Sequence, residues 1–318
     1  MKYITGTCRC GVCGRQVPEN RNVNMFRSGF VNIVGNPNVG KSTLMNALVG
    51  ERISIITSKA QTTRHRIMGI VNGEDFQIVY SDTPGVLKPN YKLQESMLRF
   101  SVGALADADV LLYVTDMVED ATKHSDFIDK VKLSAIPTLL VINKIDLADQ
   151  ERLSAKTDMW RSLLPEARII PTSATNNFNI DNLFNAIVEL LPPGESYFPA
   201  DTLTDKPLRF FASEIIRGQI LLNFDKEIPY SVEVVIESYK ESPEIDRIGA
   251  VIYVARNSQK GIIIGHKGAM LKKVGTAARK ELEAFLQKKV FLEIFVKVGE
   301  DWRNNERMLR NFGYIDKE

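Results

Sequence analysis

A chain of 318 residues is long enough for two domains, and its 44% hydrophobic and 25% charged residues exclude the disordered and fibrous classes. Because 41 Lys and Arg nearly balance 39 Asp and Glu, the net charge is only +2, and a nucleic-acid partner would need a local basic patch. No apolar run approaches the roughly 20 residues that span a bilayer, and the N-terminus lacks the apolar stretch of a secretory signal. We therefore expect a cytoplasmic protein.

Residues 1–27 are predicted to be a disordered leader, and Met25, just ahead of the first apolar run, is an alternative start. All three cysteines, Cys8, Cys10 and Cys13, lie in this leader. Their position excludes a disulfide framework for the rest of the chain and suits a reducing compartment. Zinc binding is an alternative role for the thiols, but tetrahedral zinc needs a fourth ligand and the first histidine is His65.

Residues 28–192 alternate short apolar runs with segments of helical spacing. Buried strands are predicted at residues 30–34, 77–80, 110–114, 138–142 and 168–170. This alternation predicts an α/β domain with a mostly parallel sheet and helices on both faces. Ligands of such sheets bind at the carboxyl ends of the strands, and the nucleotide motifs described next follow strands there.

The pattern G-x-x-x-x-G-K-S follows the first strand and precedes a helical segment, which is the context of a phosphate-binding loop. The residues of this loop, with the threonine that follows, are Gly35, Asn36, Pro37, Asn38, Val39, Gly40, Lys41, Ser42 and Thr43. We expect its N–H groups and the helix N-terminus to hold the phosphates of a nucleotide. Lys41 would reach the β and γ phosphates, and Ser42 would bind Mg²⁺.

Three further motifs end later strands. They are Asp82-Thr83-Pro84-Gly85 followed by Val86, Asn143-Lys144-Ile145-Asp146, and Ser173-Ala174. We expect Asp82 to hold Mg²⁺ through water and the Gly85 N–H to face the γ phosphate. The Asp146 carboxylate can accept from N1–H and N2–H₂ of guanine, a donor pair that adenine lacks, and a backbone N–H of Ser173-Ala174 would meet guanine O6. The order of these motifs favours GTP and GDP over ATP.

Residues 193–207 contain several prolines and are predicted to be a linker, because proline ends helices and cannot donate to a sheet ladder. Residues 208–318 then show the pattern of an independent α+β domain. A helix is predicted near 208–222, strands near 232–239, 250–255 and 290–298, and two helices around a glycine loop.

The glycine loop is Gly265-His266-Lys267-Gly268, and it lies within residues 256–280, which carry seven Lys or Arg, including Lys272 and Lys273, and no acid. A bare G-x-x-G pattern is weak, and an ordinary turn beside a solvated basic helix is the alternative. KH modules use such a loop between two helices to clamp about four nucleotides of single-stranded RNA. The basic context favours RNA binding.

Over residues 28–318 the sequence resembles the Era family of P-loop GTPases. The resemblance is carried by the nucleotide motifs and by these segments: Gln61-Thr62-Thr63-Arg64, Glu227-Ile228-Pro229-Tyr230-Ser231-Val232, Ile263-Ile264-Gly265-His266-Lys267-Gly268 and the closing residues 306–314. It implies a GTPase domain followed by a type II KH domain, with Thr63 or Thr62 closing onto Mg²⁺ and the γ phosphate. It also implies a monomer that binds the 3′ region of 16S rRNA in the 30S subunit and assists maturation of that subunit.

Val86 stands where Ras-like GTPases carry the glutamine that orients the attacking water, so unaided hydrolysis should be slow. Lys41, Thr63, Asp82, Gly85 and Asn38 are the predicted catalytic set. Several Era relatives recruit K⁺ through an asparagine at the position of Asn38, which implies charge stabilisation by K⁺ here. The alternative is that Asn38 only shapes the loop.

Two other functions stay open at this stage. The basic face could bind anionic lipid, giving a GTPase that acts at the cytoplasmic face of the inner membrane or on protein partners. A tRNA-modifying GTPase would need a C-terminal cysteine, and no cysteine follows Cys13. An RNA-binding module that has lost hydrolysis is the third alternative. Neither His65 nor His266 is expected to act as a catalytic base, because phosphoryl transfer depends more on positioning and charge.

Overall fold

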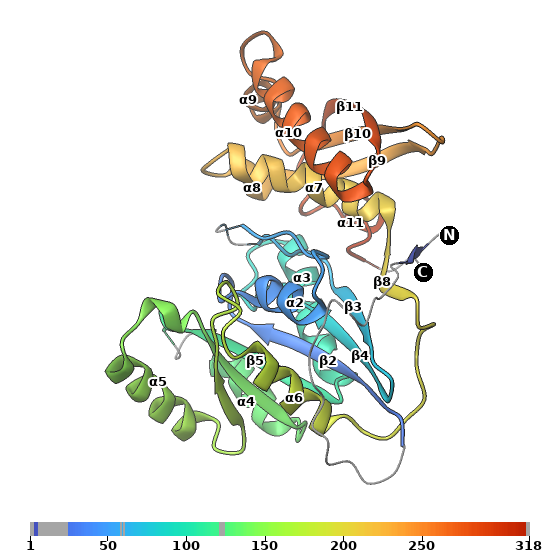
Figure 1. Cartoon of the computed structure of the whole chain (residues 1–318). Helices are drawn as coiled ribbons and strands as arrows, with labels where there is room; N and C mark the ends of the chain where they lie inside the picture. Colours follow the sequence, from blue (N-terminus) through green and yellow to red (C-terminus); the bar gives the residue numbers. More distant parts are fainter. Residues whose placement is uncertain (1–2, 6–24, 58, 60, 121–124, 316–318) are drawn as a thin grey trace.

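The computed structural model describes residues 3–5, 25–57, 59, 61–120 and 125–315. Figure 1 shows two stacked bodies: a sheet covered by helices on both faces, and above it a smaller domain coloured from yellow to red. None of the described helices is both long enough and apolar enough to cross a membrane.

The lower body is built on an eight-stranded sheet, over the described residues, in the order β1-β8-β3-β4-β2-β5-β6-β7. Its strands are β1 (Tyr3–Thr5), β2 (Arg27–Gly35), β3 (Ile67–Asn72), β4 (Phe76–Asp82), β5 (Val110–Asp116), β6 (Thr138–Asn143), β7 (Arg168–Pro171) and β8 (Thr202–Pro207). The strands β4, β2, β5, β6 and β7 are parallel to one another, whereas β3 runs antiparallel to β4. The α/β GTPase fold with a mostly parallel sheet is confirmed.

Helices cover both faces of this sheet, which explains why its central strands are apolar on both sides. They are α2 (Lys41–Val49), α3 (Lys92–Ala106), α4 (Ser125–Leu133), α5 (Gln150–Leu163) and α6 (Ile180–Leu190), with the short 3₁₀ turn η1 (Ile145–Leu147). Val31, Ile33 and Leu112 belong to a core with α2 and α6, while Val34 and Leu111 belong to a second core on the opposite face. Alternate residues of one strand thus serve opposite cores.

Two segments differ from the sequence-based expectation. The predicted linker 193–207 contains β8, whose Thr204 pairs with Gly69 of β3 and donates from its hydroxyl to the Met68 carbonyl at 2.6 Å. The prolines limit the length of this strand but do not prevent it from forming, since β8 ends at Pro207. The predicted leader begins with β1, which pairs antiparallel with β8, and Arg27 already belongs to β2. The three cysteines lie outside the described residues.

The upper body is an α+β domain. It consists of α7 (Leu208–Asn223), α8 (Ile228–Ser231), β9 (Val232–Lys240), β10 (Ile245–Val254), α9 (Asn257–Ile264), η2 (His266–Gly268), α10 (Ala269–Leu286), β11 (Lys289–Val298) and α11 (Glu306–Asn311). The sheet order is β11-β10-β9, with β9 antiparallel and β11 parallel to β10. The helices α7 and α10 bury one face of this sheet (Figure 1), and the KH assignment is confirmed.

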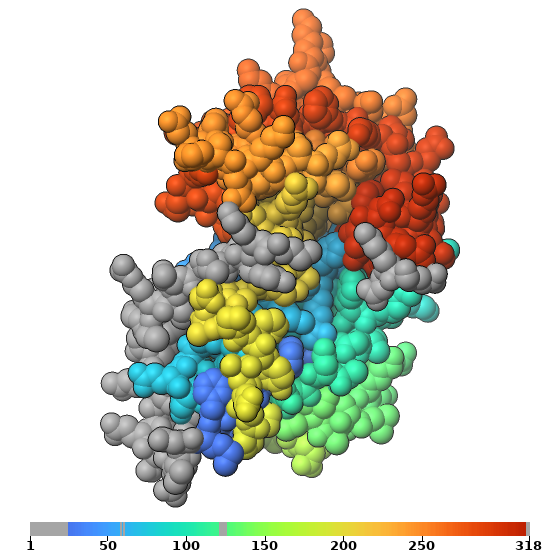
Figure 2. Space-filling model, turned by 90° about the vertical axis from the view of Figure 1, so that its right-hand side faces the viewer, coloured from blue at the N-terminus to red at the C-terminus, as the bar shows by residue number. Residues whose placement is uncertain are grey.

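The two domains share buried contacts. Trp302, Leu309 and Tyr314 of the C-terminal segment form one apolar cluster with Leu93 and Met97 of α3. Figure 2 shows the red C-terminal segment lying against the teal part of the GTPase domain. Ion pairs Lys92–Glu306 and Arg52–Glu281 join the domains at 2.7 and 2.8 Å. The domains are therefore docked, although each has its own core.

Candidate nucleotide and RNA sites

The phosphate loop joins the end of β2 to the start of α2, and two glycines allow its path. Gly35 has φ +145° and lies so close to β5 that a Cβ there would be 2.1 Å from the Val114 carbonyl oxygen. Gly40, at φ +95°, caps α2, and a Cβ there would be 2.3 Å from the Asn143 side-chain nitrogen. A larger residue at either position would displace the loop from the neighbouring strands.

Lys41 is buried, and its Nζ donates to the carbonyls of Gly35 and Asn36 at 3.1 and 2.8 Å. Burial lowers the pKa of Lys41 to about 8, although the carboxylates of Asp82 and Glu119 act in the opposite direction. An anionic phosphate beside the ammonium would restore the charged form. The site therefore favours a ligand that brings several negative charges.

Ser42, Thr63 and Asp82 meet beside this lysine. The Asp82 Oδ2 accepts from Ser42 Oγ at 2.6 Å and from Thr63 Oγ1 at 3.3 Å, and the two hydroxyl oxygens are 2.8 Å apart. The Asp82 Oδ1 is buried and has no protein partner, and burial raises the pKa of this carboxyl. Two hydroxyls and a carboxylate with a free oxygen fit Mg²⁺, whose remaining ligands would be phosphate oxygens and water.

The geometry distinguishes the two threonines. Thr62 turns away from the set: its hydroxyl donates to the Lys59 carbonyl at 2.6 Å and lies 2.7 Å from the Thr57 hydroxyl. Only Thr63 of the two faces Ser42 and Asp82. A cavity of about 350 Å³ opens here, lined by the phosphate loop from Pro37 onward, by Thr63 and by Gly85.

The base-recognition motifs lie at the ends of β6 and β7. The Asp146 Oδ1 accepts from Ser173 Oγ at 2.5 Å, and the Ala174 N–H donates to Asn143 Oδ1 at 3.0 Å. Asn143 also donates to the Val39 carbonyl at 2.9 Å, which ties this loop to the phosphate loop. The structure therefore brings together the two motifs that the sequence predicts for guanine and ties them to the phosphate loop.

Two acidic residues of this site were missed by sequence reasoning. Asp116, at the end of β5, accepts from Lys144 Nζ at 2.6 Å and from the N–H groups of Val118 and Glu119. Glu119 is largely buried near Lys41, and burial raises its pKa. The sequence feature that could have identified them is their position after a buried strand, which Asp82 shares.

Val86 and Gly85 pack tightly. Val86 is buried in the core beside Val34, and its N–H donates to the Gly35 carbonyl at 3.1 Å. A Cβ at Gly85 would be 2.7 Å from Pro37 Cα, so glycine permits this approach to the phosphate loop. Because Val86 points into the core, it leaves no side chain to orient water.

The segment of residues 61–66, here called the switch segment, contacts both domains. Arg64 is fully buried, pairs with Glu233 of β9 at 3.1 Å and donates to the carbonyls of Val232 and Pro229 at 2.6 and 3.1 Å. From the other side, Arg217 of α7 donates to the Thr62 carbonyl and pairs with Glu214 at 2.5 Å. The same segment that places Thr63 beside Asp82 is thus held by the KH domain.

His65 extends this contact. Its ring stacks on Tyr314 with centroids 4.2 Å apart, and the Tyr314 hydroxyl donates to Glu233 at 2.7 Å. Burial and the cations Lys206, Arg217 and Arg64 lower the pKa of His65 to about 3, so its imidazole is neutral. His65 is a packing residue of the interface.

The G-x-x-G loop joins α9 to α10. Gly265 and Gly268 have φ +71° and +80°, and a Cβ at Gly265 would be 2.7 Å from Met270. Between them His266 and Lys267 are exposed, as are Lys272 and Lys273 on α10. The N-terminus of α10 adds positive potential to these cations. The arrangement suits close approach of an anionic backbone.

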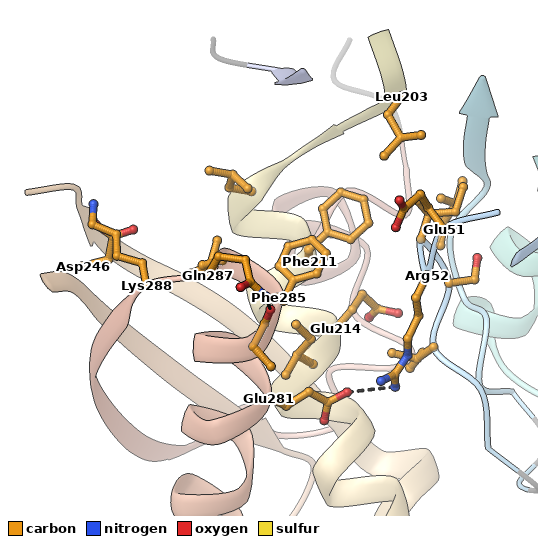
Figure 3. Close-up of a pocket in the computed structure, with 18 of the residues that line it drawn as sticks. Glu51, Arg52, Leu203, Phe211, Glu214, Asp246, Glu281, Phe285, Gln287 and Lys288 are labelled. Atoms are coloured by element: carbon orange, nitrogen blue, oxygen red, sulfur yellow. Dashed lines mark hydrogen bonds and ion pairs between the residues drawn. The ribbon is translucent and has the colours of Figure 1, made fainter. Parts of the chain in front are cut away.

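A cavity of about 810 Å³ lies between the domains (Figure 3). Phe211 and Phe285 line its apolar side, while Arg52 reaches across to Glu281. None of the residues that line this cavity belongs to the phosphate loop.

Comparison with known proteins agrees with this geometry. The family model "50S ribosome-binding GTPase" matches residues 30–144, and the "KH domain" model matches residues 227–303. The chain is 46% identical to GTPase Era of Syntrophus aciditrophicus over 294 residues (91% of this chain, 96% of that protein) and 45% identical to GTPase Era of Alkaliphilus metalliredigens over 292 residues (91% and 99%).

Two solved structures superpose on the chain with a TM-score of 0.88 at 40% identity, covering 92% of this chain and all of theirs. One is an Aquifex aeolicus Era variant bound to GDP and AlF4⁻, and the other is Era in complex with MgGDPNP and nucleotides 1506–1542 of 16S ribosomal RNA. On its sequence, its two domains and its nucleotide motifs, the chain belongs to the Era family and is a GTPase.

Proposed function

We propose that this GTPase hydrolyses GTP with Mg²⁺ and couples the nucleotide state to binding of the 3′ region of 16S rRNA during maturation of the small ribosomal subunit. The observation that carries the proposal is the switch segment, which reaches the predicted metal site through Thr63 and the KH domain through Arg64. A cytoplasmic monomer fits this role.

The residues of the nucleotide site have separate tasks in this proposal. Lys41 balances charge on the β and γ phosphates, and the Gly85 N–H orients the γ phosphate. Ser42, Thr63 and Asp82 would hold Mg²⁺, which would neutralise charge on the phosphate oxygens. Asp146 and Ser173-Ala174 select guanine.

Because Val86 cannot orient water, hydrolysis in this proposal depends more strongly on positive charge at the phosphates. We propose that Asn38 helps to hold K⁺ at the phosphates. In support, Asn38 is exposed and lines the nucleotide cavity, and its backbone at φ 67° is fixed by Lys144, whose Nζ donates to the Asn38 carbonyl at 2.5 Å.

Guanine selection is tested with Asp146→Asn. The amide can donate to the carbonyl that xanthine carries where guanine has N2–H₂, so affinity should shift from GDP toward XDP. Titration of both nucleotides against the parent and the variant measures the shift. An unchanged preference for GDP would remove Asp146 from base recognition.

RNA binding is tested with a double variant, His266→Asp with Lys267→Asp, which keeps both glycines of the loop. It places negative charge where the RNA backbone must approach, so affinity for an oligonucleotide of the 16S rRNA 3′ end should collapse. The control is Lys130→Asp with Ser162→Asp, which makes the same change in net charge on exposed helix positions of the GTPase domain. Undiminished RNA binding by the loop variant would contradict the proposal and favour a protein or membrane partner.

A further inference from the structure

The Glu119 carboxylate lies beside the phosphate loop, and none of the steps proposed above uses it. Both of its oxygens are buried and have no hydrogen-bond partner. Burial raises the pKa of this carboxyl, while the Thr115 hydroxyl and the Asn36 side chain, which face it, act in the opposite direction. Burying a carboxylate without full pairing destabilises a protein, so its presence beside a ligand site indicates a function.

The turn after β5 fixes the backbone of Glu119. The Asp116 Oδ1 accepts from the N–H groups of Val118 and Glu119 at 2.9 and 2.7 Å. From α5, Lys156 Nζ donates to the Glu119 carbonyl at 2.5 Å, so it bonds the main chain rather than the carboxylate. Within the described residues the Glu119 carboxylate is therefore held in place without an ion pair of its own.

The charge of this carboxylate acts on Lys41. Asp82 and Glu119 are the two carboxylates that favour the ammonium form of this lysine, whose Nζ bonds only main-chain carbonyls in the structure. In the filled site, Mg²⁺ at Asp82 would neutralise the first of them. Glu119 does not line the nucleotide cavity, so a metal ion bound there would leave its charge in place.

We propose that Glu119 limits the nucleotide affinity of this GTPase through its negative charge. In the empty site the carboxylate stabilises the Lys41 ammonium, and in the filled site it repels the β and γ phosphates that Lys41 would bind. Both effects weaken nucleotide binding, and both make GDP leave faster than it would with an uncharged residue at this position. Because the charges are buried, salt screens them only weakly.

The test is Glu119→Gln, which keeps the shape of the side chain and removes its charge. At about pH 8, where a carboxyl of raised pKa is still ionised, GDP and a nonhydrolysable GTP analogue should each bind about tenfold more tightly. That factor corresponds to a charge interaction of about one pKa unit. GDP release, followed by stopped flow with a fluorescent GDP, should slow by a similar factor. GMP, measured by competition, should gain little because it lacks the β and γ phosphates.

Two variants serve as controls. Glu119→Asp keeps the charge and should bind GDP as the parent does. Glu166→Gln makes the same change in net charge on an exposed residue just before β7, at the edge of the sheet opposite to the nucleotide motifs, and should also leave GDP affinity unchanged.

The direction of the change separates this role from a structural one. If Glu119 only supported the loop, Glu119→Gln would weaken nucleotide binding, so unchanged or weaker GDP affinity would overturn the proposal. An equal gain in affinity for GMP, or an equal gain in Glu119→Asp, would overturn it too, because phosphate charge would not be the cause. The inference rests on the phosphate-loop assignment, which Lys41→Ala tests separately: loss of GDP affinity there, with no gain in Glu119→Gln, would reject the role of Glu119 alone.

Discussion

Replacing Arg64 by Leu should uncouple the two domains. Arg64 is fully buried between them, and its removal leaves the Glu233 carboxylate, whose pKa is raised by burial, without its closest cation. Breaking a buried ion pair by deleting one partner costs about 3–5 kcal/mol. Glu233 keeps the Tyr314 hydroxyl at 2.7 Å, so we expect the lower end, about 3 kcal/mol, which weakens domain docking by roughly 100-fold.

The assay combines hydrogen exchange with GTP turnover. Exchange should rise in the buried contact between α3 and the C-terminal segment, while the cores of both domains stay protected. Turnover should no longer respond to RNA, although GDP and RNA each bind as before. The control is Arg168→Leu, which breaks a pair with Glu189 that is about half exposed on both sides and should cost at most about 1 kcal/mol.

A double-mutant cycle with Glu233→Leu separates the pair from general damage. If Arg64→Leu and Glu233→Leu act through their mutual contact, the double variant should be less destabilised than the sum of the single variants. Additive losses, or a response of Arg64→Leu to RNA equal to that of the parent, would refute the reasoning.

Three further results are expected. Lys41→Ala removes the cation beside the phosphates, so GTP affinity and turnover should both fall; normal values of both would make the phosphate-loop assignment wrong. Asn38→Ala should make turnover insensitive to exchange of K⁺ for Na⁺ with nucleotide still bound, and equal rates of the parent in the two salts would reject a role for K⁺. Because the pKa of Lys41 is lowered from 10.5 to about 8, it loses its proton above pH 8 in the free protein, and GTP affinity should fall by up to about tenfold per pH unit there. GTP affinity that is flat from pH 7 to 9.5 would contradict this expected loss of affinity. The same lowered pKa should make the free protein more stable between pH 8 and 10.5, because buried Lys41 then loses a charge that burial penalises.

The fold was predictable where strands are continuous apolar runs. β2, β4, β5 and β6 follow from such runs, because strands buried on both faces have no polar side. β7 follows from Ile169 and Ile170, although Arg168 before them is exposed. β3 and β8 were missed: β3 carries Gly69 and Asn72 and runs antiparallel, and β8 reads Thr-Leu-Thr-Asp-Lys-Pro, which lacks the apolar signal. β8 is a strand because of its place beside β3, and Thr204 is buried there.

The nucleotide motifs were predictable because each has a fixed spacing and follows a strand. Thr62 and Thr63 could not be distinguished by sequence, since adjacent residues of an extended segment face opposite sides and only the fold decides which side faces the metal. Arg64, Arg217, Glu233 and Tyr314 could not be grouped at all. They come from four distant segments, and their shared burial depends on how the domains dock.

The alternation along the switch segment has a thermodynamic consequence. Thr63 faces the metal site, while the Thr62 carbonyl, Arg64 and His65 face the KH domain. A movement of the switch segment at the metal site must therefore also move its contacts with the KH domain. If GTP raises RNA affinity by some factor through this segment, RNA must raise GTP affinity by the same factor. In the parent, RNA affinities measured with GDP and with a nonhydrolysable GTP analogue give one coupling factor. Nucleotide affinities measured with and without saturating RNA give the other, and the two factors should be equal. In Arg64→Leu both coupling factors should approach one together, and loss of only one of them would mean that the two sites communicate by another route.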